Sequence, residues 1–388
     1  MWPSFDQEYI DVVSKVLESG KVNYWTGQEC RKFEEEFAQY FGSSYSIALA
    51  NGTLALDLAF IALDIGEGDE VLVTSRTFIA SVSSIINAGA TPVFVDVCMN
   101  SQNILPSEIK KNLNERTKAI VCVHLGGWPC EMDEIMKIAK EHKLSVIEDC
   151  AQAHGAMYKG KSVGSIGDIG CWSFCQDKIM TTGGEGGMVT TSNPDLWEKM
   201  WSYKDHGKSY EAVYKKNHKP GFRWLHESFG TNWRMTEIQG AIGRIQLKRM
   251  PKWTEKRNIL QSKLWESCKK LPGLRVPKFK NNESSVHGAY KAYIFINEDN
   301  LKQGWNRDRI IEELTKDGVD CFSGSCSEVY LEKAFNEKPY KPKVRLKNAK
   351  ELGETSLMFL IHPTISEQEM ERKCKSITKV MTKAQMSS

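Results

Sequence analysis

The sequence of 388 residues lacks any stretch near the roughly 18 consecutive apolar residues that a membrane-spanning helix needs. It also lacks an excess of charge of one sign, because 52 Lys and Arg residues face 49 Asp and Glu residues, a formal net charge of +3. This balance gives no reason to expect a nucleic-acid or membrane-surface partner. Residues Met1–Tyr9 contain no basic segment followed by an apolar one, so we expect no secretory signal and a cytoplasmic protein.

Zinc-binding cysteine spacing is also absent. The 11 cysteines are scattered, and only Cys171 with Cys175 and Cys321 with Cys326 lie close together. Neither spacing is C-x-x-C and no matching histidine pair is nearby, so we expect no metal site. Reduced, mostly buried thiols are the simplest interpretation.

Hydrophobic residues make up 41% of the chain and charged residues 26%, which excludes intrinsic disorder and fits a globular protein with a large core. Over about the first 200 residues, short apolar runs alternate with segments of helical spacing, such as Leu54–Leu63, Pro106–Asn114 and Glu131–His142. The alternation predicts a doubly wound α/β sheet that binds ligands beyond the carboxyl ends of its strands. The predicted strands are Ser46–Ala50, Val71–Thr74, Thr91–Asp96, Ala119–His124, Ser145–Asp149, Gly170–Phe174 and Met188–Thr191.

The pattern changes after about Thr236. Residues Glu237–Leu271 predict a long helical stretch interrupted at Pro251. A strand at Ala289–Asn297 and helices at Arg307–Asp317 and Glu367–Lys383 should follow. We therefore predict a large α/β domain over residues 1–240 and a smaller α+β domain over residues 241–388.

Three segments in the first half could carry chemistry. Asn51-Gly52-Thr53 opens a helix, where free backbone N–H groups suit a phosphate, although an Asn-Gly turn with Thr53 as N-cap is the simpler alternative. Asp149 ends a predicted strand, where a helix-capping role would be equally ordinary. Lys178 lies between the strand end at Ser173 and a glycine-rich turn, where a lysine with a depressed pKa could form a Schiff base, or could simply face solvent.

Together, in this order and spacing, the segments resemble the pyridoxal-phosphate (PLP)-dependent sugar aminotransferases of the DegT/DnrJ/EryC1/StrS family. The resemblance covers nearly the whole chain and implies an aspartate-aminotransferase-like fold (fold type I), with a mostly parallel seven-stranded sheet. Further matching segments are Asn23–Gly27, Phe33–Tyr40, Ala50–Leu56, Glu148–Gly155 and Asn232–Glu237.

The resemblance assigns roles by position. Lys178 matches the lysine that holds PLP as a Schiff base, and Asp149 the carboxylate that pairs with the pyridine nitrogen, so that the ring acts as an electron sink. Gln152 matches the residue near the phenolic oxygen of the ring. The resemblance also implies that the cofactor is present as pyridoxamine phosphate between the two halves of the reaction.

Further cofactor contacts follow from the same resemblance. Phe78 matches the aromatic residue that stacks on the ring, and Gly52, Thr53 and Ser173 match the phosphate cradle. Asn232 matches a residue contributed by the neighbouring subunit, which implies a homodimer with shared active sites.

Two positions depart from the family pattern, and a third lacks a role. Asp177 precedes Lys178 where many relatives have Pro-x or Ser, and we expect it to point away from the lysine. Cys150 stands where Ala is frequent, a small change. His154 lies within the Glu148–Gly155 motif without an assignable task, and a packed, hydrogen-bonded histidine is the simplest expectation.

The resemblance implies amino transfer from L-glutamate to a nucleotide-linked keto-sugar, with Lys178 moving the proton between Cα and the cofactor. Sugar dehydratases of the same fold have histidine at this position, so Lys178 favours aminotransfer. Segments Cys321–Tyr330 and Gly353–Phe359 resemble enzymes of bacterial O-antigen pathways that aminate C4 of dTDP-4-keto-6-deoxy-D-glucose. Amination at C3, a UDP or GDP sugar, another PLP reaction, and a catalytically idle binding homologue are the alternatives.

A basic, loop-rich region could hold the diphosphate of such a substrate. Lys204, His206, Lys208 and Arg223 lie between Trp201 and Phe229, among helix breakers and aromatic residues. A solvated basic loop is at least as good an interpretation.

Overall fold

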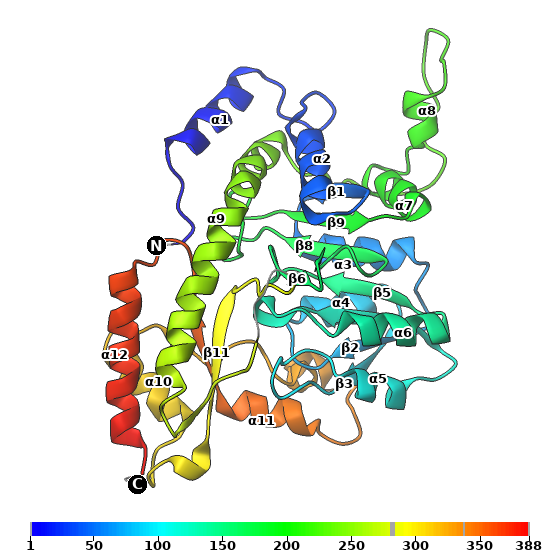
Figure 1. The fold of residues 1–388 in the computed structure, drawn as a ribbon. Coiled ribbons are helices and arrows are strands. Elements are labelled where there is room, and N and C mark those ends of the chain that lie inside the picture. The colour runs from blue at the N-terminus through cyan, green and yellow to red at the C-terminus, as the bar shows by residue number, and fades with distance from the viewer. Residues whose placement is uncertain (1, 280–283, 337, 387–388) are drawn as a thin grey trace.

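The large sheet of the computed structural model, which describes residues 2–279, 284–336 and 338–386, has seven strands (Figure 1). All neighbouring pairs are parallel except those of β9, which runs antiparallel to both β1 and β8. In spatial order the strands are β1 (Tyr45–Leu49), β9 (Gly187–Thr191), β8 (Ile169–Ser173), β5 (Ser145–Asp149), β4 (Thr117–Val123), β2 (Glu70–Thr74) and β3 (Thr91–Val95). The predicted seven-stranded, mostly parallel sheet is confirmed, and each predicted strand overlaps its observed counterpart.

Helices cover both faces of this sheet because successive side chains of a strand point to opposite faces. Val71 and Val73 of β2 pack into a core with helices α3 and α4, whereas Leu72 between them packs with α5 and α6. The helices of this part are α1 (Gln7–Glu18), α2 (Glu29–Phe41), α3 (Gly52–Ala62), α4 (Ala80–Asn87), α5 (Pro106–Asn112), α6 (Met132–His142), α7 (Pro194–Lys204) and α8 (Tyr210–Tyr214), with the short 3-10 helix η1 (Leu125–Gly127).

A smaller antiparallel sheet follows in the C-terminal part. Its strands, in spatial order, are β10 (Leu274–Arg275), β11 (Lys291–Ile296), β13 (Ser356–Leu360) and β12 (Cys321–Phe322). A core cluster joins this sheet to helices on one side. The other elements are α10 (Arg307–Lys316), α11 (Lys347–Thr355), α12 (Glu367–Ala384), the 3-10 turns η2 (Glu298–Asn300), η3 (Val329–Leu331) and η4 (Lys333–Phe335), and the hairpin of β6 (Met157–Tyr158) and β7 (Lys161–Ser162) in the first half.

Helix α9 (Glu237–Cys268) connects the two parts and passes through Pro251 without a break (Figure 1). The predicted interruption at Pro251 is therefore wrong. A proline within a helix costs about 3 kcal/mol, yet α9 packs against α1, α2 and α12 along its length, and Pro251 itself faces solvent. The division into 1–240 and 241–388 stays a prediction; Tyr330 and Phe335 from the second part pack against Phe94 of the large sheet.

The first turn of α9 holds the start of α2 through the side chain of Glu237. Glu237 is 1% exposed, and its two carboxylate oxygens accept hydrogen bonds from the backbone N–H groups of Glu29 (2.5 Å) and Cys30 (3.3 Å), at the start of α2. A Cβ on Gly27 would lie 2.1 Å from the same carboxylate, so only glycine allows this close approach. The motif residue Glu237 therefore caps a helix whose first residue, Glu29, lies 208 residues earlier in the chain.

All eleven cysteines are free, and seven of them are buried, which confirms the predicted mostly buried thiols. Within the described part of the chain, no helix is both long and apolar enough to cross a membrane.

We expect Glu237→Ala to lower the free energy of unfolding by about 1–3 kcal/mol, because two buried amides lose their acceptor. Urea titration followed by circular dichroism measures the change. The control is Glu255→Ala, which removes an exposed carboxylate from the same helix and should change stability by less than about 0.5 kcal/mol. Equal effects of the two substitutions would contradict this account.

Candidate active site

Asp149 lies at the carboxyl end of β5, the edge at which α/β sheets bind ligands. Its side chain is 7% exposed, and its oxygens accept hydrogen bonds from Ser81 Oγ (2.7 Å) and the Ala151 amide (3.1 Å). Ser81 Oγ is also 2.8 Å from Thr77 Oγ1, so the start of α4 holds the carboxylate in place. Phe78 belongs to the same turn, and its ring is 67% exposed and therefore free to contact a ligand.

The side chain of Gln152 is oriented by η1. Its carbonyl oxygen accepts a hydrogen bond from the Gly126 amide (2.8 Å), which leaves the amide nitrogen to donate elsewhere. The Gly126 carbonyl in turn accepts from the Tyr290 amide (3.0 Å), and the Gly127 carbonyl from the Gly288 amide (2.7 Å). This loop therefore joins Gln152 to the segment that precedes β11.

Gly52 and Ser173 are brought together by the packing of α3 against β8. A Cβ on Gly52 would lie 2.5 Å from Cβ of Ser173, so glycine is needed at the first position of this helix. Asn51 is the N-cap and accepts from the Leu54 amide (3.0 Å), so the alternative in which Thr53 caps the helix is wrong. The amides of Gly52 and Thr53 begin an eleven-residue helix beside the Ser173 hydroxyl, an arrangement that suits a phosphate.

Lys178 lies in the loop that follows β8. Its amide donates to the Cys175 carbonyl (3.1 Å), and its own carbonyl accepts from Nε1 of Trp2 (2.9 Å). The side chain is 17% exposed, and Nζ lies 5.3 Å from the centre of the Tyr290 ring. The lysine is therefore held at its backbone from the far end of the chain while its amine reaches a partly open site.

Asp177 does not point away from Lys178, contrary to our expectation. Its Oδ1 lies 3.9 Å from Nζ of Lys178. The hydroxyl of Tyr290 donates to the other oxygen, and Nζ of Lys291 is 3.8 Å from it, which turns the carboxylate toward the site. Burial raises the pKa of Asp177, but Lys178, the Tyr290 hydrogen bond and Lys291 outweigh it and lower the pKa overall.

Asn232 is exposed, and its backbone pairs with Asp205. In the described part of this single chain, no contact joins it to Lys178 or Asp149, so its place in a neighbouring subunit's site stays a prediction. Arg234 of the same motif forms an ion pair with Asp205 (2.7 Å) and has a structural role.

His154 is fully buried but is not hydrogen-bonded as expected. Neither ring nitrogen has a partner among the described residues, and the ring packs against Trp172 (5.2 Å) and Phe174 (5.6 Å). Burial, followed by the positive charges of Lys178 and Arg257, lowers its pKa from 6.5 to about 3. His154 is therefore neutral at physiological pH.

The basic region does not offer four free cations. Lys204 is fully buried at the end of α7, with Nζ 3.7 Å from the centre of the Tyr24 ring and 4.0 Å from Glu34, so it is unavailable to a substrate. Lys208 lies 2.7 Å from Asp205. His206 and Arg223 are exposed.

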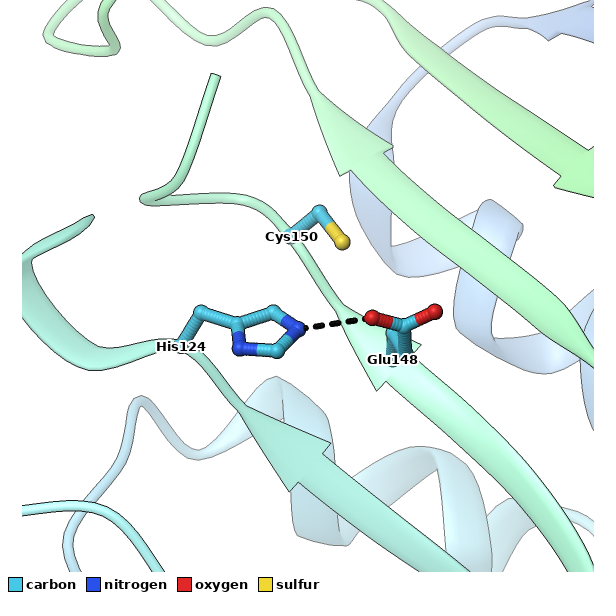
Figure 2. Close-up of side chains that lie close together, drawn as sticks. All are labelled: His124, Glu148 and Cys150. Carbon is cyan, nitrogen blue, oxygen red and sulfur yellow. Dashed lines mark hydrogen bonds and ion pairs between the residues drawn. The ribbon is translucent and has the colours of Figure 1, made fainter. Parts of the chain in front are cut away.

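A buried cluster of His124, Glu148 and Cys150, which the sequence reasoning missed, lies at the carboxyl ends of β4 and β5 (Figure 2). His124 Nε2 is 3.0 Å from Glu148 Oε2, and its Nδ1 accepts from the Cys130 amide (3.0 Å). Glu148 also accepts from the backbone amides of 164, 166 and 167 at 2.6–2.9 Å. The histidine and carboxylate are thus already bonded within the protein, which favours a structural role over metal binding.

Glu148 and Asp149 are neighbours in one strand, so their side chains point to opposite faces. Burial raises the pKa of Glu148, but hydrogen bonds from His124 and from backbone amides lower it overall. The sequence did contain a signal for this cluster, the acidic pair Glu148-Asp149 at the end of a predicted strand. Because neighbouring side chains of a strand point to opposite faces, one of the two carboxylates had to point into the interior and needed hydrogen-bond partners there.

A partly buried lysine beyond a β-strand, a buried carboxylate at the end of the neighbouring strand, and a helix N-terminus paired with a serine hydroxyl define a PLP-enzyme type of site on an α/β fold. The comparisons agree: residues 3–378 match the DegT/DnrJ/EryC1/StrS aminotransferase family, and the chain belongs to it. The protein is thus a PLP-dependent aminotransferase with the fold of type I PLP enzymes.

The chain is similar to proteins of several bacteria. The solved structure of an aminotransferase from Psychrobacter cryohalolentis is 61% identical, with a TM-score of 0.97 over 99% of this chain and 98% of that chain. GDP-perosamine synthase of Escherichia coli O157:H7 is 33% identical, covering 97% of this chain and 96% of the relative. The dTDP-3-amino-3,6-dideoxy-alpha-D-galactopyranose transaminase of Aneurinibacillus thermoaerophilus is 39% identical, covering 73% and 74%.

The buried, neutral His154 should make stability depend on pH. Its folded pKa of about 3 lies below the 6.5 of the unfolded chain, so the unfolded state binds the proton first and stability falls as pH drops below about 6.5. We expect His154→Leu to remove about 1 kcal/mol of this decline per pH unit between about pH 6 and about pH 5. Urea titrations across this range test it, with the exposed His142→Leu as a control that keeps the wild-type slope; an unchanged slope in His154→Leu would refute the assignment.

Proposed function

We propose that this enzyme transfers the amino group of L-glutamate to C4 of a nucleotide-linked 4-keto-6-deoxyhexose. The first acceptor to test is dTDP-4-keto-6-deoxy-D-glucose, which would give dTDP-4-amino-4,6-dideoxy-D-glucose for O-antigen or other surface polysaccharide, in the cytoplasm. The observation that carries the amino-transfer reaction is the amine of Lys178 in the loop beyond β8, within a chain of this aminotransferase family.

The described residues fit PLP. Gly52, Thr53 and Ser173 would hold its phosphate, because a Cβ on Gly52 would fill the space between α3 and Ser173. Asp149 would pair with the pyridine nitrogen, and Gln152 would donate its amide nitrogen toward the phenolic oxygen. The exposed Phe78 ring would stack on the cofactor, which when bound supplies an electron sink for negative charge at the donor Cα.

In this proposal the chain supplies positioning and proton transfer. The amine of Lys178, once free, would take the proton from the donor Cα as general base and deliver it to the cofactor as general acid. The Ser81 hydroxyl and the Ala151 amide keep the Asp149 carboxylate in place. In the second half-reaction, with the acceptor sugar bound, the same steps run in reverse and Lys178 again moves the proton.

The acceptor assignment is supported by the place of the two C-terminal segments on which the resemblance rested. The Thr77 amide donates to the Cys326 carbonyl (3.1 Å), which sets this segment beside the Phe78 turn. A Cβ on Gly353 would lie 2.8 Å from Cβ of Ser327, so the two segments also pack together. In this proposal the first segment, beside the Phe78 turn, and the second, packed on it, contact the sugar acceptor.

The proposal includes a homodimer with shared active sites. The loop after α8 extends from the body of the molecule (Figure 1) and carries exposed aromatic rings: Phe222 is 78% exposed, Trp224 85% and Phe229 99%. Asn232 follows three residues later and is exposed too. Large exposed apolar side chains near each other favour a protein partner, and a second copy would bury them.

The second candidate function is the same reaction with a different nucleotide or a different carbon, because two relatives are named for such sugars. One is named for a GDP sugar and the other for a dTDP sugar that carries its amine at C3. An idle binding homologue is disfavoured, because the lysine, the carboxylate and Gln152 are all in place.

We expect L-glutamate to bleach the visible absorbance of the purified, yellow enzyme, and dTDP-4-keto-6-deoxy-D-glucose to restore that absorbance. Mass spectrometry should show that the sugar has exchanged its keto oxygen for one amino group. A panel of dTDP, UDP and GDP keto-sugars serves as the control for the nucleotide and the carbon. Amination of only a GDP sugar, or at C3, would replace the acceptor assignment and leave aminotransfer intact.

Lys178→Ala should lose turnover by about four orders of magnitude or more, because the nucleophile and proton carrier are the same group. The exposed Lys137→Ala is the control. Steady-state rates measure the change, and full turnover in Lys178→Ala would end the assignment.

A further inference from the structure

The carboxylate of Asp177 is shared by two lysines. Its Oδ1 lies 3.9 Å from Nζ of Lys178 and its Oδ2 3.8 Å from Nζ of Lys291, while the Tyr290 hydroxyl donates to Oδ2. One negative charge therefore faces two positive charges at the side of the site that β11 forms.

Other groups nearby add to this positive excess. Arg257 is fully buried and donates to the carbonyls of Ala289 (3.4 Å) and Ile361, and it has no carboxylate partner within the described residues. His154 and His362 contribute no charge of either sign, because burial lowers their pKa values to about 3 and about 4.

Lys291 is the cation that can accept a further anion. It is the first residue of β11, its side chain is 16% exposed, and Nζ lies 4.6 Å from the centre of the Tyr290 ring. Burial lowers its pKa, and Asp177 opposes this only in part because Lys178 and Arg257 lower it further. A half-buried ammonium with a shared counter-charge gains from a second negative partner.

We propose that Lys291 binds a carboxylate of the amino donor beside Lys178. This inference rests on the proposed function, because an α-amino acid carries its carboxylate on the carbon whose proton Lys178 removes. A cation near that amine is thus placed to hold the carboxylate and orient Cα. The diphosphate of the acceptor is the other anion that could reach it, and the two half-reactions separate these sources.

The experiment compares Lys291→Met, which keeps the length and removes the charge, with Lys291→Arg, which restores it. Lys263→Met is the matched control, because Lys263 is also partly exposed and paired with one carboxylate, Glu371 at 2.7 Å, outside the site. Bleaching by L-glutamate reports the donor half-reaction, the return of colour with the keto-sugar reports the acceptor half-reaction, and calorimetry reports 2-oxoglutarate binding to the PLP-loaded enzyme.

We expect Lys291→Met to raise the L-glutamate concentration for half-maximal bleaching, and the dissociation constant of 2-oxoglutarate, by roughly 10- to 100-fold. The keto-sugar concentration needed in the second half-reaction should stay within about twofold, and Lys291→Arg should recover most of the loss. Donor constants equal to those of Lys263→Met, or a loss confined to the keto-sugar step, would overturn the proposal. Lys291→Gln replaces Lys291→Met if the latter fails to bind PLP.

The wild-type enzyme separates this inference from the proposed function. If L-glutamate fails to bleach it, the donor assignment is wrong, and the same variants are compared with the α-amino acid that does bleach it and its keto acid. If the donor is an amine without a carboxylate, the inference about Lys291 is overturned.

Discussion

The alternation of side chains at the end of β5 places two carboxylates that cannot share one environment. Asp149 faces the site, so Glu148 must face the interior, where an unpaired carboxylate would be strongly unfavourable. His124 and three backbone amides satisfy it. These hydrogen bonds join residues 164–167 and His124, which follows β4, to β5. They therefore fix the end of the strand that carries Asp149 from the face opposite the site.

A second set of contacts joins segments that are far apart in the sequence. The Asn232–Glu237 motif looks like one functional signature in the sequence, but its members divide in the structure. Glu237 caps α2 and Arg234 pairs with Asp205, whereas Asn232 is exposed. A family motif thus combines residues that build the scaffold with one that remains available for binding.

Much of the large sheet could be predicted because buried parallel strands leave nearly continuous apolar runs, and Asp149, Ser173 and Lys178 follow the ends of such runs. Pro251 misled because local chemistry predicts a break, whereas packing along all of α9 outweighs it. The orientation of Asp177 could not be predicted from its neighbour in sequence, since Tyr290 and Lys291, at the start of β11, come more than 100 residues later. Lys204 looked like a loop cation because nothing local reveals that Tyr24 and Glu34 enclose it.

The contact between Trp2 and the lysine segment has a practical consequence. The Trp2 ring lies 5.0 Å from that of Trp253 and 5.2 Å from the Arg257 guanidinium, while its N–H meets the Lys178 carbonyl. An affinity tag fused ahead of Trp2 would lie next to the hydrogen bond between Trp2 and the Lys178 carbonyl. A tag fused beyond α12 would not disturb that hydrogen bond. Expression vectors that append the tag after the last helix are therefore the better choice for spectroscopy on this enzyme.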